Sequence, residues 1–183
     1  MTDRRVLIPL FPLVFLALLC GQETKQATEK LAPYYPTPEI VVDKMLRLGE
    51  MKAGEKMYDL GSGDGRIVIM AARKYHADAT GVEFDDDLWK QSMDKIRSLG
   101  LQKTARIIHG DLMKQDYSSA DLLTVYLLPV SNDKVRPLLE KQLKKGARIV
   151  AHDFEFSGWV PEKTESIEDD GEGRSHTLYL DRR

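Results

Sequence analysis

The chain has 183 residues, of which 42% are hydrophobic and 31% charged, an ordinary balance for one globular domain with a buried core. The formal net charge of −2 gives no electrostatic reason to expect nucleic acid as a partner. The single cysteine, Cys20, excludes an internal disulfide.

The first stretch of the chain is a short basic start followed by an apolar run over residues 6–20. A helix needs about 20 apolar residues to cross a bilayer, and this layout is also that of a bacterial export signal. The end of the run resembles a degenerate lipobox with Cys20 at the lipidated position, although Leu19 is bulky there. We predict that residues 1–21 are a lipoprotein signal, a retained membrane anchor or a cleaved signal, so the protein is membrane-associated or exported. A buried hydrophobic N-terminal helix is the remaining alternative. Residues 22–33 are polar and read as a tether.

A proline-rich segment at residues 34–38 follows the tether. Each proline fixes its own φ and biases the preceding residue away from helix, so this segment is predicted to be extended. Thr37 is predicted to cap a helix that begins at Pro38. A strand over residues 55–60 comes next and leads into a turn with three glycines in five residues.

The glycine turn, with Gly61, Gly63 and Gly65, lies between this strand and a buried helix over residues 67–73. Glycine lets the backbone turn sharply and approach a ligand closely. In open α/β sheets such a turn binds nucleotide-like ligands. The dinucleotide fingerprint requires G-x-G-x-x-G, and here Arg66 stands at the third glycine. The turn therefore indicates a ligand other than NAD.

Strands and helices alternate through the rest of the chain. The pattern predicts strands at 77–84, 105–109, 120–128 and 147–152, helices at 85–99 and 135–143, and a closing hairpin of 163–167 with 176–180. Alternation of this kind argues for a mainly parallel sheet with helices on both faces. We predict one α/β domain over residues 34–183, with a Rossmann-like, doubly wound, seven-stranded sheet and a C-terminal antiparallel hairpin.

Four pieces of sequence in this order resemble a known family. They are Tyr35-Pro36-Thr37-Pro38, the loop from Asp59 to Arg66, residues 124–129, and His152-Asp153-Phe154. The loop resembles motif I of class I S-adenosylmethionine (SAM)-dependent methyltransferases. Together the pieces resemble the small lysine-methyltransferase-like family that includes the ATP synthase c-subunit lysine methyltransferases.

The resemblance implies SAM as cofactor and a lysine side chain of a protein, including a membrane protein, as methyl acceptor. Two alternatives stay open. One is a methyltransferase acting on a small molecule or lipid. The other is a non-catalytic SAM-binding envelope protein, because SAM is made in the cytosol and an exported domain would lack it.

The resemblance and the positions in the sheet together give a predicted cofactor site. Glu83 ends a strand about twenty residues past the glycine turn, where an acid accepts two hydrogen bonds from a ribose diol. Asp111 resembles the acid that binds the adenine amino group, and Asp59 the acid that holds the ammonium group. Asp64 has the alternative role of a helix N-cap. The residues predicted to contact SAM are Tyr35, Thr37, Asp59, Gly61, Ser62, Gly63, Asp64, Gly65, Glu83, Asp111 and Leu112.

The methyl acceptor is predicted to lie at the end of the fourth strand, at Tyr126. A lysine amine has a pKa of about 10.4 and must lose a proton before it attacks the methyl group. An apolar, aromatic slot lowers that pKa by disfavouring the charged form. The candidates for this slot are Tyr126, Leu128, Pro129, Phe154 and Trp159, and we predict that Leu128 and Phe154 are core residues instead.

His152 and Asp153 end the fifth strand at the same edge of the sheet. Either could accept the lysine proton, although adjacent strand residues point to opposite faces. We therefore predict catalytic roles for Tyr126 and for His152 or Asp153. The other histidines, at 76, 109 and 176, show no metal-ligand spacing with cysteine or acids, so we predict no metal.

Overall fold

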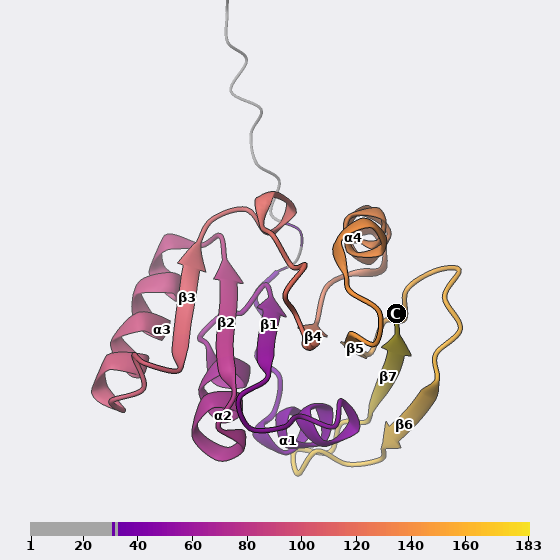
Figure 1. Ribbon diagram of the computed structural model, residues 1–183. Helices are drawn as coiled ribbons and strands as arrows, with labels where there is room; N and C mark the ends of the chain where they lie inside the picture. The colour runs from indigo at the N-terminus through magenta and orange to yellow at the C-terminus, as the bar shows by residue number, and fades with distance from the viewer. Residues whose placement is uncertain (1–30, 32) are drawn as a thin grey trace, which may run out of the picture.

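The computed structural model describes residue 31 and residues 33–183. Figure 1 shows this part of the chain as one layered α/β unit. None of the helices within it is both long and apolar enough to cross a membrane. The predicted signal or anchor at residues 1–21, Cys20 included, lies outside the described residues.

Seven strands form one sheet in the order β3-β2-β1-β4-β5-β7-β6. The strands are β1 (Lys56–Leu60), β2 (Asp78–Glu83), β3 (Ala105–His109), β4 (Leu122–Val125), β5 (Arg148–His152), β6 (Lys163–Ile167) and β7 (His176–Arg182). The first five pair in parallel, and β7 runs antiparallel to both β5 and β6. This topology confirms the predicted fold class.

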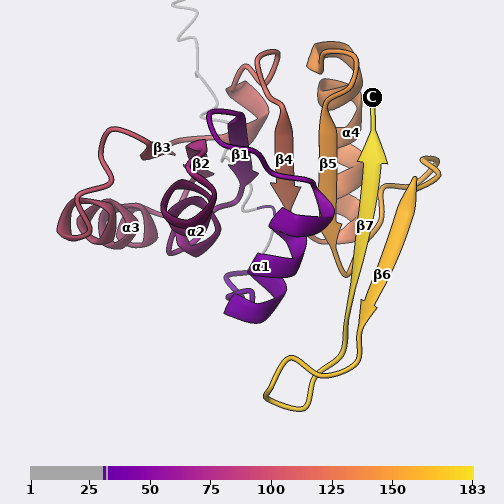
Figure 2. The same ribbon diagram turned by 60° about the horizontal axis from the view of Figure 1, so that its bottom comes forward.

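Helices cover both faces of the sheet, as Figures 1 and 2 show. One face packs against α1 (Glu39–Leu48), α2 (Arg66–Tyr75) and α3 (Asp86–Ser98). The other packs against α4 (Pro129–Gln142). Period-two alternation in the central strands divides the core between these faces. In β4, Leu122 joins the cluster under α1 and Leu123 the cluster under α4, and both are fully buried.

Predicted boundaries were wrong in two segments, each of which contains a proline at the start of a helix. Helix α1 begins at Glu39 with Pro38 as its N-cap, so Thr37 does not cap it; the Thr37 hydroxyl instead lies 3.3 Å from His152 Nδ1. Strand β4 ends at Val125, and α4 begins at Pro129 rather than near residue 135. Proline suits the first helical position, because its missing N–H would have no partner there.

The strand order reverses between β1 and β4, because the chain first proceeds outward through β2 and β3 and then returns. At such a switch point the loops leave in opposite directions and open a crevice outside the carboxyl ends of the strands. The glycine turn after β1 and the segment after β4 meet there. A short 3-10 helix (Leu112–Lys114) after β3 closes the same edge.

Candidate active site

The glycine turn adopts a backbone that only glycine takes easily. Gly61, Gly63 and Gly65 have φ values of 77°, 52° and 76°, in the left-handed region. The turn is held against β2, since the amides of Gly61 and Ser62 both donate to the Val82 carbonyl at 3.0 Å. The turn is therefore a fixed part of the fold.

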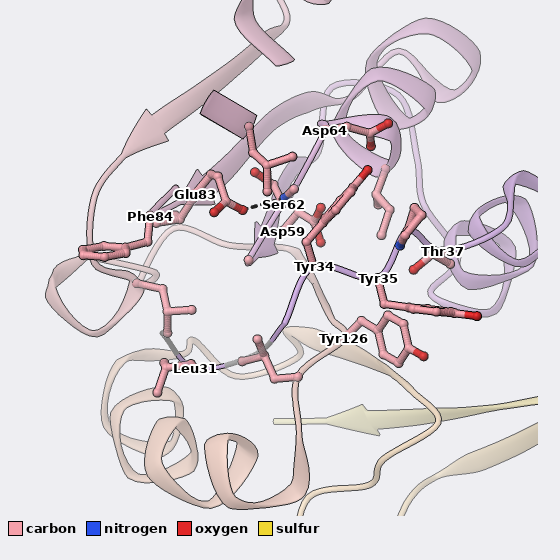
Figure 3. A pocket seen from close by; sticks show the side chains of 18 of the residues that line it. Leu31, Tyr34, Tyr35, Thr37, Asp59, Ser62, Asp64, Glu83, Phe84 and Tyr126 are labelled. Atoms are coloured by element: carbon pink, nitrogen blue, oxygen red, sulfur yellow. Dashed lines mark hydrogen bonds between the residues drawn. The ribbon is translucent and has the colours of Figure 1, made fainter. Parts of the chain in front are cut away.

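A cleft opens above this turn and encloses about 870 Å³ of empty space, the solvent at its mouth included. Glu83 and Phe84 lie at one end, Tyr35 and Tyr126 at the other, and Asp59 between them (Figure 3). All the residues predicted to contact the cofactor line this cleft except Gly65. That glycine is the N-cap of α2, and a Cβ on it would lie 3.0 Å from Ser92.

Glu83 is buried at the carboxyl end of β2, with 7% of its surface exposed. Its Oε2 accepts a hydrogen bond from the Gly63 amide at 2.7 Å, and its Oε1 accepts one from the Asp85 amide at 2.8 Å. A carboxylate has about four lone-pair sites, so each oxygen can still accept from a ligand. Asp85 itself caps α3, as expected for part of this acidic cluster.

Asp111 follows β3 and holds the 3-10 helix through its Oδ1, which accepts from the Met113 amide at 2.8 Å. Leu112 is buried beside it and lines the cleft. Ser62 also lines the cleft, and its buried hydroxyl has no hydrogen-bond partner within the described residues. A buried polar atom without a partner costs free energy, so a ligand with polar groups would complete this wall.

The two aspartates of the glycine turn have opposite electrostatic environments. Asp59 is 2% exposed, and burial raises its pKa to about 7, although its Oδ1 accepts from the Thr124 hydroxyl at 2.7 Å. Burial would also raise the pKa of Asp64, but bonds from Arg66 and the charge of Lys95 outweigh it and lower that pKa. Asp64 also accepts from the Arg66 amide in the first turn of α2.

These pKa shifts predict that neutralising the two aspartates changes the stability of the protein in opposite directions. With a pKa raised from 3.8 to about 7, Asp59 binds a proton more tightly in the folded state. It therefore lowers stability progressively as pH rises from about 4 through 7. We expect Asp59→Asn to raise Tm at pH 8 by on the order of 10 °C, since a shift of about three pKa units corresponds to about 4 kcal/mol and 1 kcal/mol is about 2–4 °C in a domain of this size.

The measurement is Tm of both variants between pH 4 and 8 without cofactor. The gain of Asp59→Asn over the wild type should grow with pH. Asp64→Asn is the matched control, since its lowered pKa gives stability that is present at neutral pH and lost as pH falls. It should lower Tm at pH 8. A gain in Tm from Asp59→Asn that does not change with pH would contradict the raised pKa of Asp59.

Sequence reasoning missed Tyr34, which lies across the glycine turn (Figure 3). Its ring is so close that a Cβ on Gly63 would lie 2.8 Å from Tyr34 Cε2. Arg66 anchors the same segment, because its Nη1 donates to the Thr37 carbonyl at 2.8 Å. Tyr35 is 52% exposed, and its hydroxyl accepts a hydrogen bond from Arg174 in the β6–β7 loop. In the sequence, only the position of Tyr34 within the proline-rich segment indicated that it could lie at the site.

Gly63→Ala should weaken cofactor binding without unfolding the protein. The new Cβ must push the exposed Tyr34 ring aside, and alanine is strained at a φ of 52°. A cost of about 1–3 kcal/mol at the site corresponds to an affinity loss on the order of 10- to 100-fold. Titration calorimetry with SAM measures it. The control is Gly171→Ala, with φ 92° and open space around the Cβ, which should leave affinity unchanged.

The acceptor end of the cleft is built around Tyr126. Its ring packs on His152 with centroids 3.9 Å apart, and its hydroxyl donates to Asp153 Oδ2 at 3.3 Å. Burial, and then the charge of Asp153, raise the pKa of Tyr126 to about 12. His152 is 1% exposed and lies behind this ring, outside the lining of the cleft. Asp153 is partly exposed beside it.

Only part of the predicted aromatic slot forms. Trp159 was wrongly placed in it, because it is buried against Phe156 with ring centroids 4.4 Å apart, in the core under α4. Leu128 was expected in the core but is 39% exposed. Phe154 lies 6.5 Å from the Tyr126 ring and is half-buried. Hydrophobicity alone therefore did not distinguish buried core residues from exposed residues around the acceptor end of the cleft.

Comparisons with known proteins decide the family. The model of the ANTKMT methyltransferase domain matches residues 59–163, which contain the glycine turn, the strand-end acids and Tyr126. The chain belongs to this methyltransferase family. A crystal structure titled as an RNA methyltransferase from Salinibacter ruber, in complex with S-adenosyl-L-homocysteine, is 42% identical. The match covers 80% of this chain and 92% of the Salinibacter ruber chain, with a TM-score of 0.74.

Curated relatives give the same result. A protein-lysine N-methyltransferase of Saccharolobus islandicus is 40% identical over 149 residues, covering 81% of this chain and 91% of the relative. The mouse lysine N-methyltransferase of the ATP synthase c-subunit is 30% identical over 132 residues. That match covers 72% of this chain and 53% of the mouse protein. The enzyme is thus a SAM-dependent methyltransferase.

SAM is the cofactor of this enzyme, and the cleft suits it. Its ammonium group, ribose diol and adenine amino group all need hydrogen-bond acceptors, and the carboxylates of Asp59, Glu83 and Asp111 line the cleft. Phe84 and Leu112 add apolar surface at the same end as Glu83. SAM supplies the methyl group and a sulfur that leaves as a neutral thioether, so the protein needs no acid to assist departure.

Proposed function

We propose that the enzyme transfers the SAM methyl group to the side-chain nitrogen of a lysine in a protein. The charge of the cleft carries this proposal. Among its described lining residues the ionisable acids are Asp59, Asp64, Glu83 and Asp111, and the one cation, Arg66, is paired with Asp64 at 3.0 Å. Four carboxylates and one paired cation give the cleft a negative potential, which favours a cationic lysine over an acceptor that carries phosphates. The names of the Saccharolobus islandicus and mouse relatives support the same acceptor.

In this proposal the residues of the cleft would hold SAM, which would supply its methyl group to an acceptor beside Tyr126. Glu83 accepts from the ribose hydroxyls, and Asp111 and Leu112 receive the adenine. The methionine end lies on the glycine turn, where Asp59 and Asp64 face its ammonium group and Ser62 offers a hydroxyl. Tyr35 and Thr37 cover that end.

At the acceptor end, the chemistry is one displacement. The lysine nitrogen loses its proton, its lone pair forms the N–C bond, and the C–S electron pair leaves with sulfur. Alignment and exclusion of water supply most of the rate enhancement. We propose that Tyr126 forms one wall for the lysine and that Asp153 orients its amine or takes the proton. His152 is less suited to that step, because it is 1% exposed and lies behind the Tyr126 ring, whereas Asp153 is partly exposed.

The competing acceptor is RNA, because the Salinibacter ruber structure bears that title. The experiment offers labelled SAM to a membrane extract, to an RNA preparation and to a lipid fraction, with Glu83→Ala as the inactive control. Label in protein, with methyl-lysine after hydrolysis and none with the control, is expected. Label in RNA or lipid instead would overturn the lysine proposal. Label in none would favour a SAM-binding protein without catalysis.

We further propose that residues 1–21 hold the enzyme at a membrane surface, through a retained anchor or a lipid on Cys20. The apolar run over residues 6–20 supports this proposal. Cell fractionation with protease accessibility tests it and tells which side the domain faces. A wild-type protein found entirely in the soluble fraction would contradict it, as would fractionation unaltered by deletion of residues 2–21.

A further inference from the structure

Two histidines and an aspartate converge behind Tyr126, where the end of β5 meets the start of β7. His152 Nε2 lies 2.9 Å from His176 Nδ1 and 3.4 Å from Asp153 Oδ2. His176 Nδ1 lies 3.3 Å from the same carboxylate oxygen. Three potential ligand atoms therefore form a nearly equilateral triangle, in which both histidines are buried and Asp153 is partly exposed.

The size of this triangle matches a metal centre. A first-row divalent ion binds imidazole nitrogen and carboxylate oxygen at about 2.0–2.2 Å. Two such ligands at 90–110° around one ion are about 2.8–3.6 Å apart, by geometry from those bond lengths. The three observed separations fall in this interval. Two histidines and one carboxylate are also a ligand set found in zinc and non-haem iron enzymes, where three protein ligands leave positions open.

The outer side of each histidine is also occupied. His176 Nε2 lies 3.1 Å from Asp170 Oδ2, and His152 Nδ1 lies 3.3 Å from the Thr37 hydroxyl. Metal-bound histidines almost always use their second nitrogen in this way, which fixes the ring and directs the other nitrogen inward. Asp170 has a fully buried side chain and is itself fixed by Arg174 Nε at 2.9 Å.

Asp153 is held in an unusual backbone conformation that turns its carboxylate into the cluster. Its φ is 59°, in the left-handed region that non-glycine residues seldom adopt. Its Oδ1 accepts from the Thr177 amide at 2.9 Å, which leaves Oδ2 facing the two histidines. Strain of this kind persists where the surrounding structure imposes it, often at functional sites.

We propose that His152 Nε2, Asp153 Oδ2 and His176 Nδ1 bind a divalent first-row transition metal ion, with zinc as the representative. The ion would link β5 to β7 beneath the acceptor end of the cleft, and the Tyr126 hydroxyl already contacts the carboxylate oxygen. This differs from the sequence-based prediction of no metal. That prediction considered His176 but looked for ligands close in sequence, and His152 lies 24 residues away on another strand.

The test uses the full chain in detergent after treatment with a chelator. Zinc is titrated by calorimetry, and cobalt is added while visible absorption is recorded, because protein-bound Co²⁺ gives bands that the hydrated ion lacks. One equivalent should bind and raise Tm, since a ligand for the folded state stabilises it. His176→Gln and Asp153→Asn should each weaken binding by at least about 100-fold, since loss of an outer-shell partner alone costs about 10- to 100-fold. His76→Asn, an exposed histidine outside the cluster, should bind as the wild type does.

Tm of the metal-free variants, and their affinity for S-adenosylhomocysteine, show whether they are folded. His152→Asn provides a third ligand variant if either of the first two fails to fold. The same low affinity for zinc in the wild type and the variants, with unchanged Tm and no cobalt bands, would overturn the proposal. The cluster would then be only a chain of hydrogen bonds between two strands. Asp153 is also the residue proposed to orient the lysine, so methyl transfer is not a readout of this experiment. Cofactor binding at Glu83 is expected to be unaffected in either case, so a failure of the metal proposal is distinguishable from a failure of the proposed function.

Discussion

Replacing Glu83 with alanine is expected to reduce SAM affinity on the order of 100-fold or more. The proposed role gives this carboxylate two hydrogen bonds from the ribose, and a hydrogen bond to a charged group contributes about 1.5–3 kcal/mol. Two of them correspond to at least a 100-fold change in Kd. The substitution also removes the acceptor of the Gly63 amide, 2.7 Å away, so the glycine turn loses a fixed point.

Titration calorimetry with SAM and with S-adenosylhomocysteine measures this loss. Asp86→Ala is the matched control, since Asp86 belongs to the same acidic cluster but lies on the exposed surface of α3, paired with Lys90. It should leave both affinities within a factor of about two, as surface substitutions usually change a free energy by less than 0.5 kcal/mol. Unchanged affinity in Glu83→Ala would place the ribose elsewhere.

Tyr126→Ala is expected to lower the rate of methyl transfer on the order of 100-fold while SAM affinity changes little. The ring forms a wall at the acceptor end, and misplacing a reacting group by about 1 Å can cost 100-fold in rate. The proposed cofactor contacts at Glu83, Asp59 and the glycine turn do not involve the Tyr126 side chain, which lies at the opposite end of the cleft from Glu83 (Figure 3). Single-turnover transfer of labelled methyl separates the chemical step from substrate binding.

Tyr126→Phe separates the ring from its hydroxyl, which contacts Asp153 at 3.3 Å. We expect a smaller loss of rate than with alanine, because the phenyl wall remains. Tyr75→Phe is the matched control, since its hydroxyl bonds Asp43 on α1, outside the cleft. A loss of SAM affinity as large as the loss of rate in Tyr126→Ala would instead make Tyr126 part of the cofactor site.

The sequence was sufficient for the elements that depend on local pattern. The glycine turn was recognisable because Gly61, Gly63 and Gly65 all need a left-handed backbone. Glu83 and Asp111 were identifiable because parallel strands bring their carboxyl ends to one edge. Ten of the predicted cofactor residues do line one cleft, and Gly65 instead begins α2.

Features that depend on contacts between distant segments could not be read in the same way. Thr37 was taken for a helix cap because threonine before proline is a local signal, whereas its hydroxyl pairs with His152, 115 residues away. The pairing of His152 with His176 depends on the register of β5 against β7, which places His152 opposite Leu178. Tyr34 and Tyr35 are adjacent residues of the same type, so the sequence could not tell which one lies over the glycine turn. Only the path of the chain places Tyr34 over Gly63.

The most direct test of the account is an experimental structure of the enzyme with S-adenosylhomocysteine bound. The ribose hydroxyls should lie within hydrogen-bond distance of Glu83, the adenine against Leu112, and the sulfur toward Tyr126. Tyr34 should cover the methionine end. A ligand bound outside the switch point between β1 and β4, or a cleft filled by the ring of Tyr34 with no ligand in it, would contradict the account.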